Sequence, residues 1–406
     1  MTVHGHAAPG YEGVAEAFAR NLDEGREVGA ALSVVRDGDL VVDLWGGLAD
    51  RDTGRPWAPD TLQLVYSGTK ALVATCVLVL VERGQINLDN PLSGYWPQFA
   101  ARGKSRVTVA EVLSHQARLP VVHTPLTPVE SLDNRRMAAL LADQPQETDP
   151  RAGFLYHALT FGWLVAELIR LVDGRELGAF FADEIAGPLG LDLWIGLPDE
   201  QHHRMSRICY APDWADLPGG AGAGPTGGAG PDPVGGGAGG PGIDPVGAGT
   251  DPFLASLDNP DVLHPGDEWF WNSPALWRAG QPGGGAVGDT RSMARLFGCL
   301  ALGGTLDGVT ILRPETVALG RREIRRGREL VGGTELAYAA GYALPTVSRD
   351  FGPPRDAFGH NGFGGSCHAA WPTQRLGVSY APNQLSALSP NPCRPPLMEA
   401  LHRAVR

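Results

Sequence analysis

The stretch Ser67-Gly68-Thr69-Lys70 follows a short apolar run, residues 61–66, and opens a segment, residues 67–83, that is apolar almost throughout. The length and composition of residues 67–83 predict a buried helix. A serine at the start of a helix and a lysine one turn later share a face, so their side chains can hydrogen-bond. A lysine amine placed in this way can help to take the proton of a serine nucleophile. Lys70 is also one of only two lysines among 406 residues, which makes the pattern a scarce one in this chain.

The composition indicates an ordinary globular protein and excludes some partners. Hydrophobic residues make up 43% of the chain and charged residues 19%, as in typical globular domains. The net charge is −12 and no long basic run is present, which argues against a nucleic-acid partner or an anionic membrane surface. We find no signal-peptide pattern and no apolar run of about 18 residues, so we expect a cytoplasmic protein. The five cysteines are odd in number and form no Cys-x-x-Cys, so we expect reduced thiols.

The predicted elements form two groups. Two β-branched runs joined at Asp37-Gly38 predict a hairpin, and strand character returns near the C-terminus. Strands at both ends with helices between them predict an α+β fold, an antiparallel sheet flanked by terminal helices plus an inserted, mostly helical domain. We assign residues 1–60 and 285–406 to the α/β domain and residues 61–284 to the helical domain, with a substrate cleft between them. Predicted strands cover residues 30–36, 39–45, 336–344, 368–371 and 376–380, and predicted helices cover residues 11–21, 67–83, 109–114, 133–142, 159–172, 177–184 and 396–405.

Residues 219–249 differ sharply from the rest of the chain. They are mostly glycine, proline and alanine, and the sequence Asp-Pro-Val-Gly at 232–235 recurs at 244–247. Such a segment cannot bury enough apolar surface to order itself. We expect a mobile excursion from the helical domain, and a tolerated surface insertion rather than a substrate lid.

Two further segments carry polar groups that a serine nucleophile would need. Tyr156 opens a predicted helix, and residues 358–366 form a glycine-rich run that leads into a strand. Glycines of this kind let backbone N–H groups approach a ligand closely. Taken singly, Tyr156 predicts only an aromatic residue at a helix start, and residues 358–366 only a tight turn.

Taken together, Ser67-Gly68-Thr69-Lys70, Tyr156-His157-Ala158 and His360-Asn361-Gly362 resemble the three motifs of the serine β-lactamase and penicillin-binding-protein superfamily. Within it the chain is most similar to the class C β-lactamase-like esterases, the family VIII carboxylesterases. The resemblance covers nearly the whole chain apart from the glycine-rich segment, and its motifs occur in the expected order. It implies the β-lactamase/transpeptidase-like fold. Connecting segments at residues 82–91, 107–116 and 187–191 also resemble the family.

The resemblance also implies roles for individual residues. Ser67 would attack a substrate carbonyl and carry the acyl group, while Lys70 and Tyr156 would share the general-base role, a nearby lysine ammonium favouring the tyrosinate. Which of these two takes the Ser67 proton stays open. The backbone N–H groups of Ser67 and Phe363 would form the oxyanion hole, and His360-Asn361-Gly362 would contact the substrate.

The chain departs from the penicillin-recognising members at two positions. His360 stands where they carry a permanently charged lysine, and Ala158 stands where many of them carry an asparagine. Both changes favour a neutral acyl substrate over an anionic antibiotic. The aromatic residues at 269–271 and 277 would line an acyl pocket or, as we expect for most of them, pack in the core.

Other site types fail on the pattern of residues. The run Gly364-Gly365-Ser366-Cys367-His368 ends in histidine, so it lacks the last glycine of an α/β-hydrolase nucleophile elbow. We find no His-Glu-x-x-His and no phosphate-binding loop. We therefore expect neither a metal nor a cofactor.

The sequence predicts a serine hydrolase that forms an acyl-enzyme at Ser67 and cleaves small, neutral carboxylic esters. A transacylase that passes the acyl group to an amine or alcohol, as some relatives in natural-product biosynthesis do, is the first alternative. The others are a β-lactamase or DD-peptidase-like enzyme acting on amides, and a non-catalytic binding protein that keeps the fold. The sequence predicts no oligomeric state.

Overall fold

The computed structural model describes residues 2–212, 268–329, 334–386 and 391–406, so the predicted excursion at 219–249 lies outside the described residues. Its largest sheet has seven strands, all paired antiparallel, in the order β1-β3-β2-β15-β14-β13, with β4 paired to β3. The two ends of the chain thus build one sheet, as the sequence predicts. The strands are β1 (Val3–Ala7), β2 (Gly29–Arg36), β3 (Asp39–Asp50), β4 (Arg55–Pro56), β13 (Phe358–Asn361), β14 (Cys367–Trp371) and β15 (Leu376–Pro382).

The predicted hairpin is confirmed and forms the β2–β3 pair. Its two turn residues, Asp37 and Gly38, both have positive φ angles, 53° and 98°. This is the mirror-image turn whose twist matches that of the flanking strands. Strand β1, which we did not predict, then pairs along the outer edge of β3.

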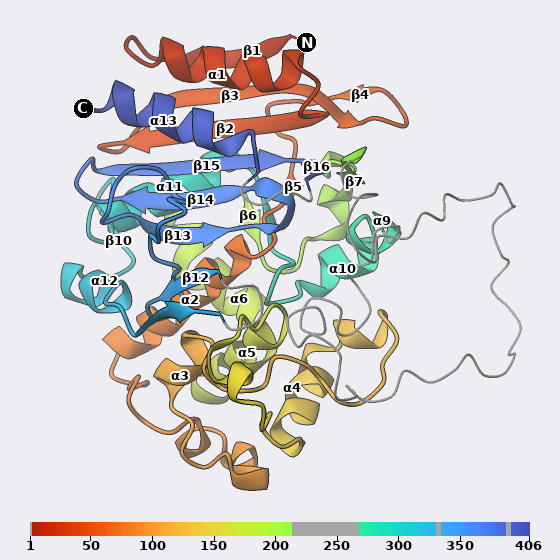
Figure 1. The fold of residues 1–406 in the computed structure, drawn as a ribbon, viewed down its shortest axis with the longest axis vertical. Coiled ribbons are helices and arrows are strands. Elements are labelled where there is room, and N and C mark those ends of the chain that lie inside the picture. The colour runs from red at the N-terminus through yellow and green to blue at the C-terminus, as the bar shows by residue number, and fades with distance from the viewer. Residues whose placement is uncertain (1, 213–267, 330–333, 387–390) are drawn as a thin grey trace, which may run out of the picture.

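The two faces of the large sheet are covered by different elements (Figure 1). Helices α1 (Glu12–Asp23) and α13 (Arg394–Ala404) cover the face that we call the outer face, where large apolar side chains of β14 and β15 pack. Helix α11 (Thr290–Ala301) packs against β2, β14 and β15 on the opposite, inner face. A Cβ at Gly377 would collide with the backbone of α11, so glycine lets the helix approach this closely.

Helix α2 (Gly68–Glu82) is buried along most of its length because it is apolar almost throughout. It packs against α5 (Thr160–Asp173), α6 (Leu177–Phe181), α12 (Pro314–Gly320) and β13. The predicted helices at 11–21, 67–83, 109–114, 133–142, 159–172 and 396–405 are confirmed to within about two residues at each end, the usual uncertainty of helix boundaries. The other α-helices in the described residues are α3 (Val109–Leu113), α4 (Asn134–Asp143), α7 (Gly187–Leu189), α9 (Glu268–Trp271) and α10 (Pro274–Ala279).

Two predicted elements are shorter than expected. The helix predicted at 177–184 is α-helical only to Phe181 and continues as a π-helical turn. The strand predicted at 336–344 ends at Tyr338, since Gly341 has φ = 86° and packs against Ala74. The remaining strands are β5 (Gln63–Leu64), β6 (Leu193–Trp194), β7 (Cys209–Tyr210), β8 (Val287–Gly288), β9 (Thr305–Leu306), β10 (Val309–Thr310), β11 (Arg325–Arg328), β12 (Glu335–Tyr338) and β16 (Gln384–Leu385).

The predicted domain boundaries meet in a small sheet. Strand β8 pairs with both β5 and β6, so the chain near residue 61 lies beside the chain near residue 285. The division of the chain at these two positions stays a prediction.

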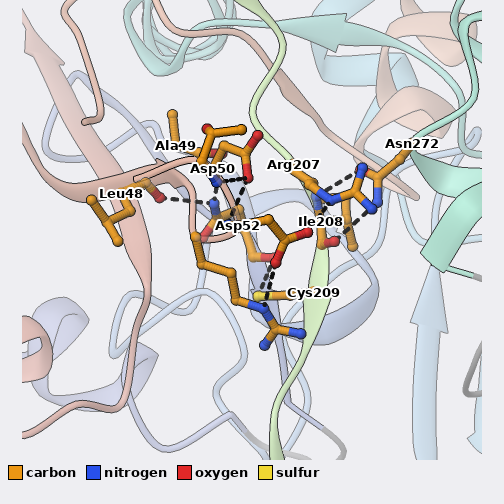
Figure 2. Close-up of polar contacts among 11 residues, drawn as sticks. Leu48, Ala49, Asp50, Asp52, Arg207, Ile208, Cys209 and Asn272 are labelled. Carbon is orange, nitrogen blue, oxygen red and sulfur yellow. Dashed lines mark hydrogen bonds and ion pairs between the residues drawn. The ribbon is translucent and has the colours of Figure 1, made fainter. Parts of the chain in front are cut away.

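The described chain on either side of residues 213–267 is held together by side-chain bonds (Figure 2). The Asn272 amide spans the backbone of Ile208, accepting from its N–H at 2.8 Å and donating to its carbonyl at 3.0 Å. The neighbouring Arg207 donates its backbone N–H to Ala49 at 2.7 Å, and its guanidinium pairs with Asp52 at 2.8 Å. We call the Asn272–Ile208 pair the clamp.

Candidate active site

The turn before α2 is strained. Tyr66 has φ = 46°, a left-handed conformation that a bulky residue rarely adopts. The turn is closed by the Gly68 N–H, which donates to Val65 O at 2.9 Å, and by the Thr69 N–H, which donates to Tyr66 O at 2.8 Å. No described residue accepts the Ser67 N–H. This donor therefore lies free at the positive end of the α2 dipole, where negative charge is stabilised.

Lys70 is fully buried and bonded to uncharged groups. Its Nζ lies 2.6 Å from Ala158 O, 2.7 Å from Gly283 O and 3.1 Å from Ser67 Oγ. Burial without a carboxylate partner lowers the pKa of Lys70 well below its usual value. A neutral amine would give its two N–H groups to the two carbonyls and direct its lone pair at the Ser67 hydroxyl. This is the geometry of a general base.

Tyr156 completes the contact around Ser67. Its hydroxyl donates to Ser67 Oγ at 2.8 Å, and Lys70 Nζ lies 4.9 Å from the centre of its ring. The structure thus brings together the three side chains that the sequence selected from distant segments. Burial raises the pKa of Tyr156, which outweighs the smaller, opposite effect of its bond to Ser67. These directions favour a neutral phenol beside a neutral amine, whereas the resemblance implied a tyrosinate beside a lysine ammonium, and the roles of the two groups stay a prediction.

A cluster of aromatic rings supports Tyr156. The Tyr338 ring lies nearly parallel to it, with centroids 6.3 Å apart, and the His115 ring contacts both at 4.7 and 4.4 Å. His115 Nδ1 accepts the His157 N–H at 3.1 Å, and burial lowers the pKa of both imidazoles, that of His157 to about 4. Uncharged rings therefore surround Tyr156. Sequence reasoning missed Tyr338 and His115, whose partners lie far away along the chain.

The motif His360-Asn361-Gly362 ends β13 beside this cluster. The His360 ring lies 6.0 Å from that of Tyr156, and its Nδ1 donates to Asn361 O at 2.8 Å. Burial lowers the pKa of His360 to about 3, so the site lacks a permanent positive charge at this position. A Cβ at Gly362 would lie 2.8 Å from Val65 O, which is why only glycine fits against the nucleophile turn.

Phe363 follows this motif and begins a short 3-10 turn, Phe363–Gly365. Its ring lies edge-on to Tyr66 with centroids 6.0 Å apart, which places residue 363 against the nucleophile turn. On another side Trp271 packs edge-on against Tyr66 at 5.1 Å. Trp271, one of the aromatic residues considered for an acyl pocket, therefore adjoins this turn. The oxyanion role of the Phe363 N–H stays a prediction.

The described residues contain no group of three or more His, Cys, Asp or Glu side chains that could hold a metal ion. All five cysteines are buried free thiols. In the described part of the chain, no helix combines the length and apolar character needed to cross a membrane. The predicted cytoplasmic location stays a prediction.

Comparison with known proteins identifies a family. The Beta-lactamase family model matches residues 14–400. The esterase/beta-lactamase LipL of Mycobacterium tuberculosis (strain ATCC 25618 / H37Rv) is 33% identical over 395 residues, which cover 96% of this chain and 84% of LipL.

Two solved structures are similar over 100% of both chains. A crystal structure of a family VIII carboxylesterase superposes with a TM-score of 0.84 at 34% identity, and that of a penicillin-binding protein homologue from Caulobacter crescentus with a TM-score of 0.84 at 32% identity. The match of nearly the whole chain, together with the serine, lysine and tyrosine gathered at the start of α2, shows that this chain belongs to the β-lactamase family.

Proposed function

We propose that this protein is a serine carboxylesterase that acts on small, neutral esters through an acyl-enzyme at Ser67. The observation that carries the proposal is the pair of contacts at Ser67 Oγ, 3.1 Å to Lys70 Nζ and 2.8 Å to Tyr156 Oη. The names of its relatives, an esterase/beta-lactamase and a family VIII carboxylesterase, support the same chemistry.

The pKa directions suggest how the proton moves. Burial lowers the pKa of Lys70 and so favours the neutral amine, which takes the proton of Ser67 as Oγ attacks the ester carbonyl. Tyr156 donates to Oγ in the resting enzyme and is placed to pass its proton to the departing alkoxide. The Lys70 ammonium then returns to Tyr156 the proton that it took from Ser67, so both groups end the acylation neutral. The tetrahedral oxyanion forms beside the backbone N–H groups of Ser67 and Phe363. Water then attacks the acyl-enzyme by the same steps in reverse.

The electrostatics of the site favour an uncharged substrate. His360 is neutral, and the Lys70 amine is occupied by two carbonyls and Ser67. A substrate carboxylate would therefore lose its hydration without gaining contact with a permanent cation at His360 or Lys70. Ala158 offers only its backbone carbonyl, which is already bonded to Lys70.

We place the site at the junction of the two predicted parts of the chain. Ser67, Lys70 and Tyr156 come from residues 61–284, while His360 and Phe363 come from residues 285–406. The packing of α2 against β13 supports a junction at this position.

The experiment compares the wild type with Ser67→Ala. We expect the wild type to hydrolyse p-nitrophenyl esters and to be labelled by a fluorophosphonate, and Ser67→Ala to do neither. A chromogenic cephalosporin tests lactamase activity, and added amines test transfer of the acyl group. Formation of amide product at the expense of free acid would replace the esterase proposal by the transacylase. An unlabelled wild type would favour a binding protein without catalysis.

A further inference from the structure

A row of polar side chains crosses the inner face of the large sheet behind the nucleophile. The strand register pairs His360 with His368, His368 with Ser379, Ser379 with Ser33, and Ser33 with Asp43. Side chains directly opposite each other on neighbouring antiparallel strands point to the same face. All five are buried, so this row lies inside the protein between the sheet and the helices of the inner face.

The two ends of the row are held by different helices. At one end, Ser33 Oγ bonds to Thr290 Oγ1 of α11 at 2.8 Å and donates to Asp43 Oδ1 at 3.2 Å. Asp43 in turn pairs with Arg291 of α11 at 3.0 Å. Closer to the active site, His368 Nδ1 bonds to Ser379 Oγ at 2.9 Å, and the imidazole lies against Gly68 of α2.

His368 packs directly against the residue that follows the nucleophile. A Cβ added at Gly68 would lie 2.6 Å from His368 Cδ2 and 3.2 Å from His368 Nε2, so no larger residue fits there unless the ring moves. Gly68 is the first residue of α2, and its N–H closes the strained turn at Tyr66. The ring of His368 therefore packs beneath the turn that carries Ser67.

Stability alone does not explain a histidine at this position. His368 is fully buried, and its Nε2 has no hydrogen-bond partner among the described residues. A buried polar atom without a partner is destabilising, by about 1–3 kcal/mol in typical cases. A smaller apolar residue would avoid this cost but would leave Gly68 without support. Burial also lowers the pKa of His368 to about 3, so the ring stays neutral and cannot serve as a charged group of the site.

We propose that His368 is a positioning residue for Ser67: its ring, held by Ser379, supports the first turn of α2 at Gly68 and fixes the Ser67 N–H and Oγ against Lys70 and Tyr156. This inference rests on the proposed function. Without the His368 ring beneath it, the strained turn at Tyr66 would relax. A shift of about 1 Å in a nucleophile can lower the rate by about 100-fold.

The test is a set of four proteins: the wild type, Gly68→Ala, His368→Ala and the double variant. We expect Gly68→Ala to lower kcat by about 100-fold because its methyl group collides with the ring, and His368→Ala to lower it by about tenfold. In the double variant the methyl group enters the space that the ring has left. If the two losses were independent, the kcat of the double variant would be the wild-type value divided by both factors. We expect the measured kcat to be at least about tenfold higher than that value. KM for the ester should stay within about threefold, since the ring lies beneath the turn.

Two variants of the row separate positioning from general stability. Ser379→Ala removes the bond that holds the ring and should lower kcat by about threefold to tenfold. Ser33→Ala, the matched control one strand further along the row, removes the bonds to Thr290 of α11 and to Asp43, and should leave kcat unchanged. The rate of fluorophosphonate labelling at Ser67 and the Tm are measured for every variant. The labelling rate should fall in parallel with kcat in Ser379→Ala and should not fall in Ser33→Ala.

The result that would overturn the positioning role is simple additivity of Gly68→Ala and His368→Ala in both kcat and labelling rate. A change in Tm alone, with normal labelling of the folded protein, would overturn it as well. A wild type that is not labelled at Ser67 would overturn the proposed function instead. The two failures are thus distinguishable.

Discussion

The two faces of the large sheet differ in what they bury. On the outer face, Trp371, Leu376 and Val378 pack with α1 and α13 in an apolar cluster. On the inner face, the same strands present His368 and Ser379. Alternate residues of one strand therefore serve different purposes, because successive side chains point to opposite faces. The difference teaches that the outer face is packed mainly by apolar contacts, whereas the inner face, although α11 packs on it, also buries polar side chains next to the active site.

The largest effect is expected in the active site, at Lys70. Lys70→Met keeps a side chain of similar length but removes the amine that contacts Ser67. We expect kcat for a p-nitrophenyl ester to fall by about two to four orders of magnitude, as for a lost general base. Circular dichroism should show a folded protein. Near-normal turnover would contradict the assignment of Lys70 as the base.

The pH profile of the wild type sharpens the same point. The base is active when deprotonated, so kcat/KM should fall as the pH drops through the pKa of Lys70. Because burial lowers that pKa, we expect full activity to extend well below the pH at which an exposed lysine loses its proton. A rate that keeps rising up to the pKa of an ordinary lysine would contradict the lowered pKa.

Tyr156→Phe should also lower kcat by about two to four orders of magnitude, since its hydroxyl is the group that contacts Ser67 Oγ. The phenyl ring should stay stacked on Tyr338, so the fold is kept. Tyr338→Phe is the matched control because it changes the neighbouring ring in the same way, and its kcat should stay within about threefold. Equal losses in the two variants would mean that the ring cluster, and not the contact with Ser67, sets the rate.

On the outer face, the expected effect is on stability and not on rate. Leu397 of α13 is fully buried in the outer cluster, and Leu397→Ala should lower the free energy of unfolding by about 2–5 kcal/mol in a urea titration. The kcat of the folded protein should be unchanged. A large fall in the kcat of fully folded Leu397→Ala would show that packing on the outer face also affects the active site, and this would contradict the separation of the two faces.

A pH-dependent effect on stability is expected at Glu27, a carboxyl group buried near the outer face. The Tyr380 hydroxyl donates to it, the Cys393 thiol and Arg26 lie nearby, and burial raises its pKa from 4.5 to about 8. The folded state therefore holds this proton more tightly than the unfolded state. Its contribution to stability is fully present below pH 4.5 and is lost as the pH rises toward 8. We expect Tm to fall over this range more steeply in the wild type than in Glu27→Gln, and parallel profiles would contradict the raised pKa.

Local rules explain which parts of the fold could be predicted from the sequence. The hairpin follows from Asp37-Gly38, whose positive φ angles are set within the turn itself. Helix α2 and the Ser67–Lys70 pair follow from a spacing of three residues along an apolar segment. Strand β1 was missed because its residues are largely exposed and its pairing with β3 bridges about 40 positions, which no short-range pattern reveals.

The site shows the same limit. Ser67, Lys70 and Tyr156 were selected because the resemblance joined motifs that no local rule connects, and their geometry then came from the fold. The sequence showed His368 only as the residue that spoils a nucleophile elbow. Its contact with Gly68 spans 300 positions and depends on the register of β14 against its neighbours. Such contacts are set by tertiary packing, so periodicity and motif spacing carry no signal for them.

The clamp has a consequence for how this scaffold tolerates change. Because Asn272 bonds both backbone groups of Ile208, the chain closes on itself independently of what connects the two residues. The entropy of closing a loop rises only slowly with its length, by about 0.6 kcal/mol for each doubling. Connections of very different length can therefore be exchanged at this point with little effect on the turn before α2 that carries the nucleophile. The connection between Ile208 and Asn272 is therefore a suitable position for inserting a reporter or a second module into the enzyme.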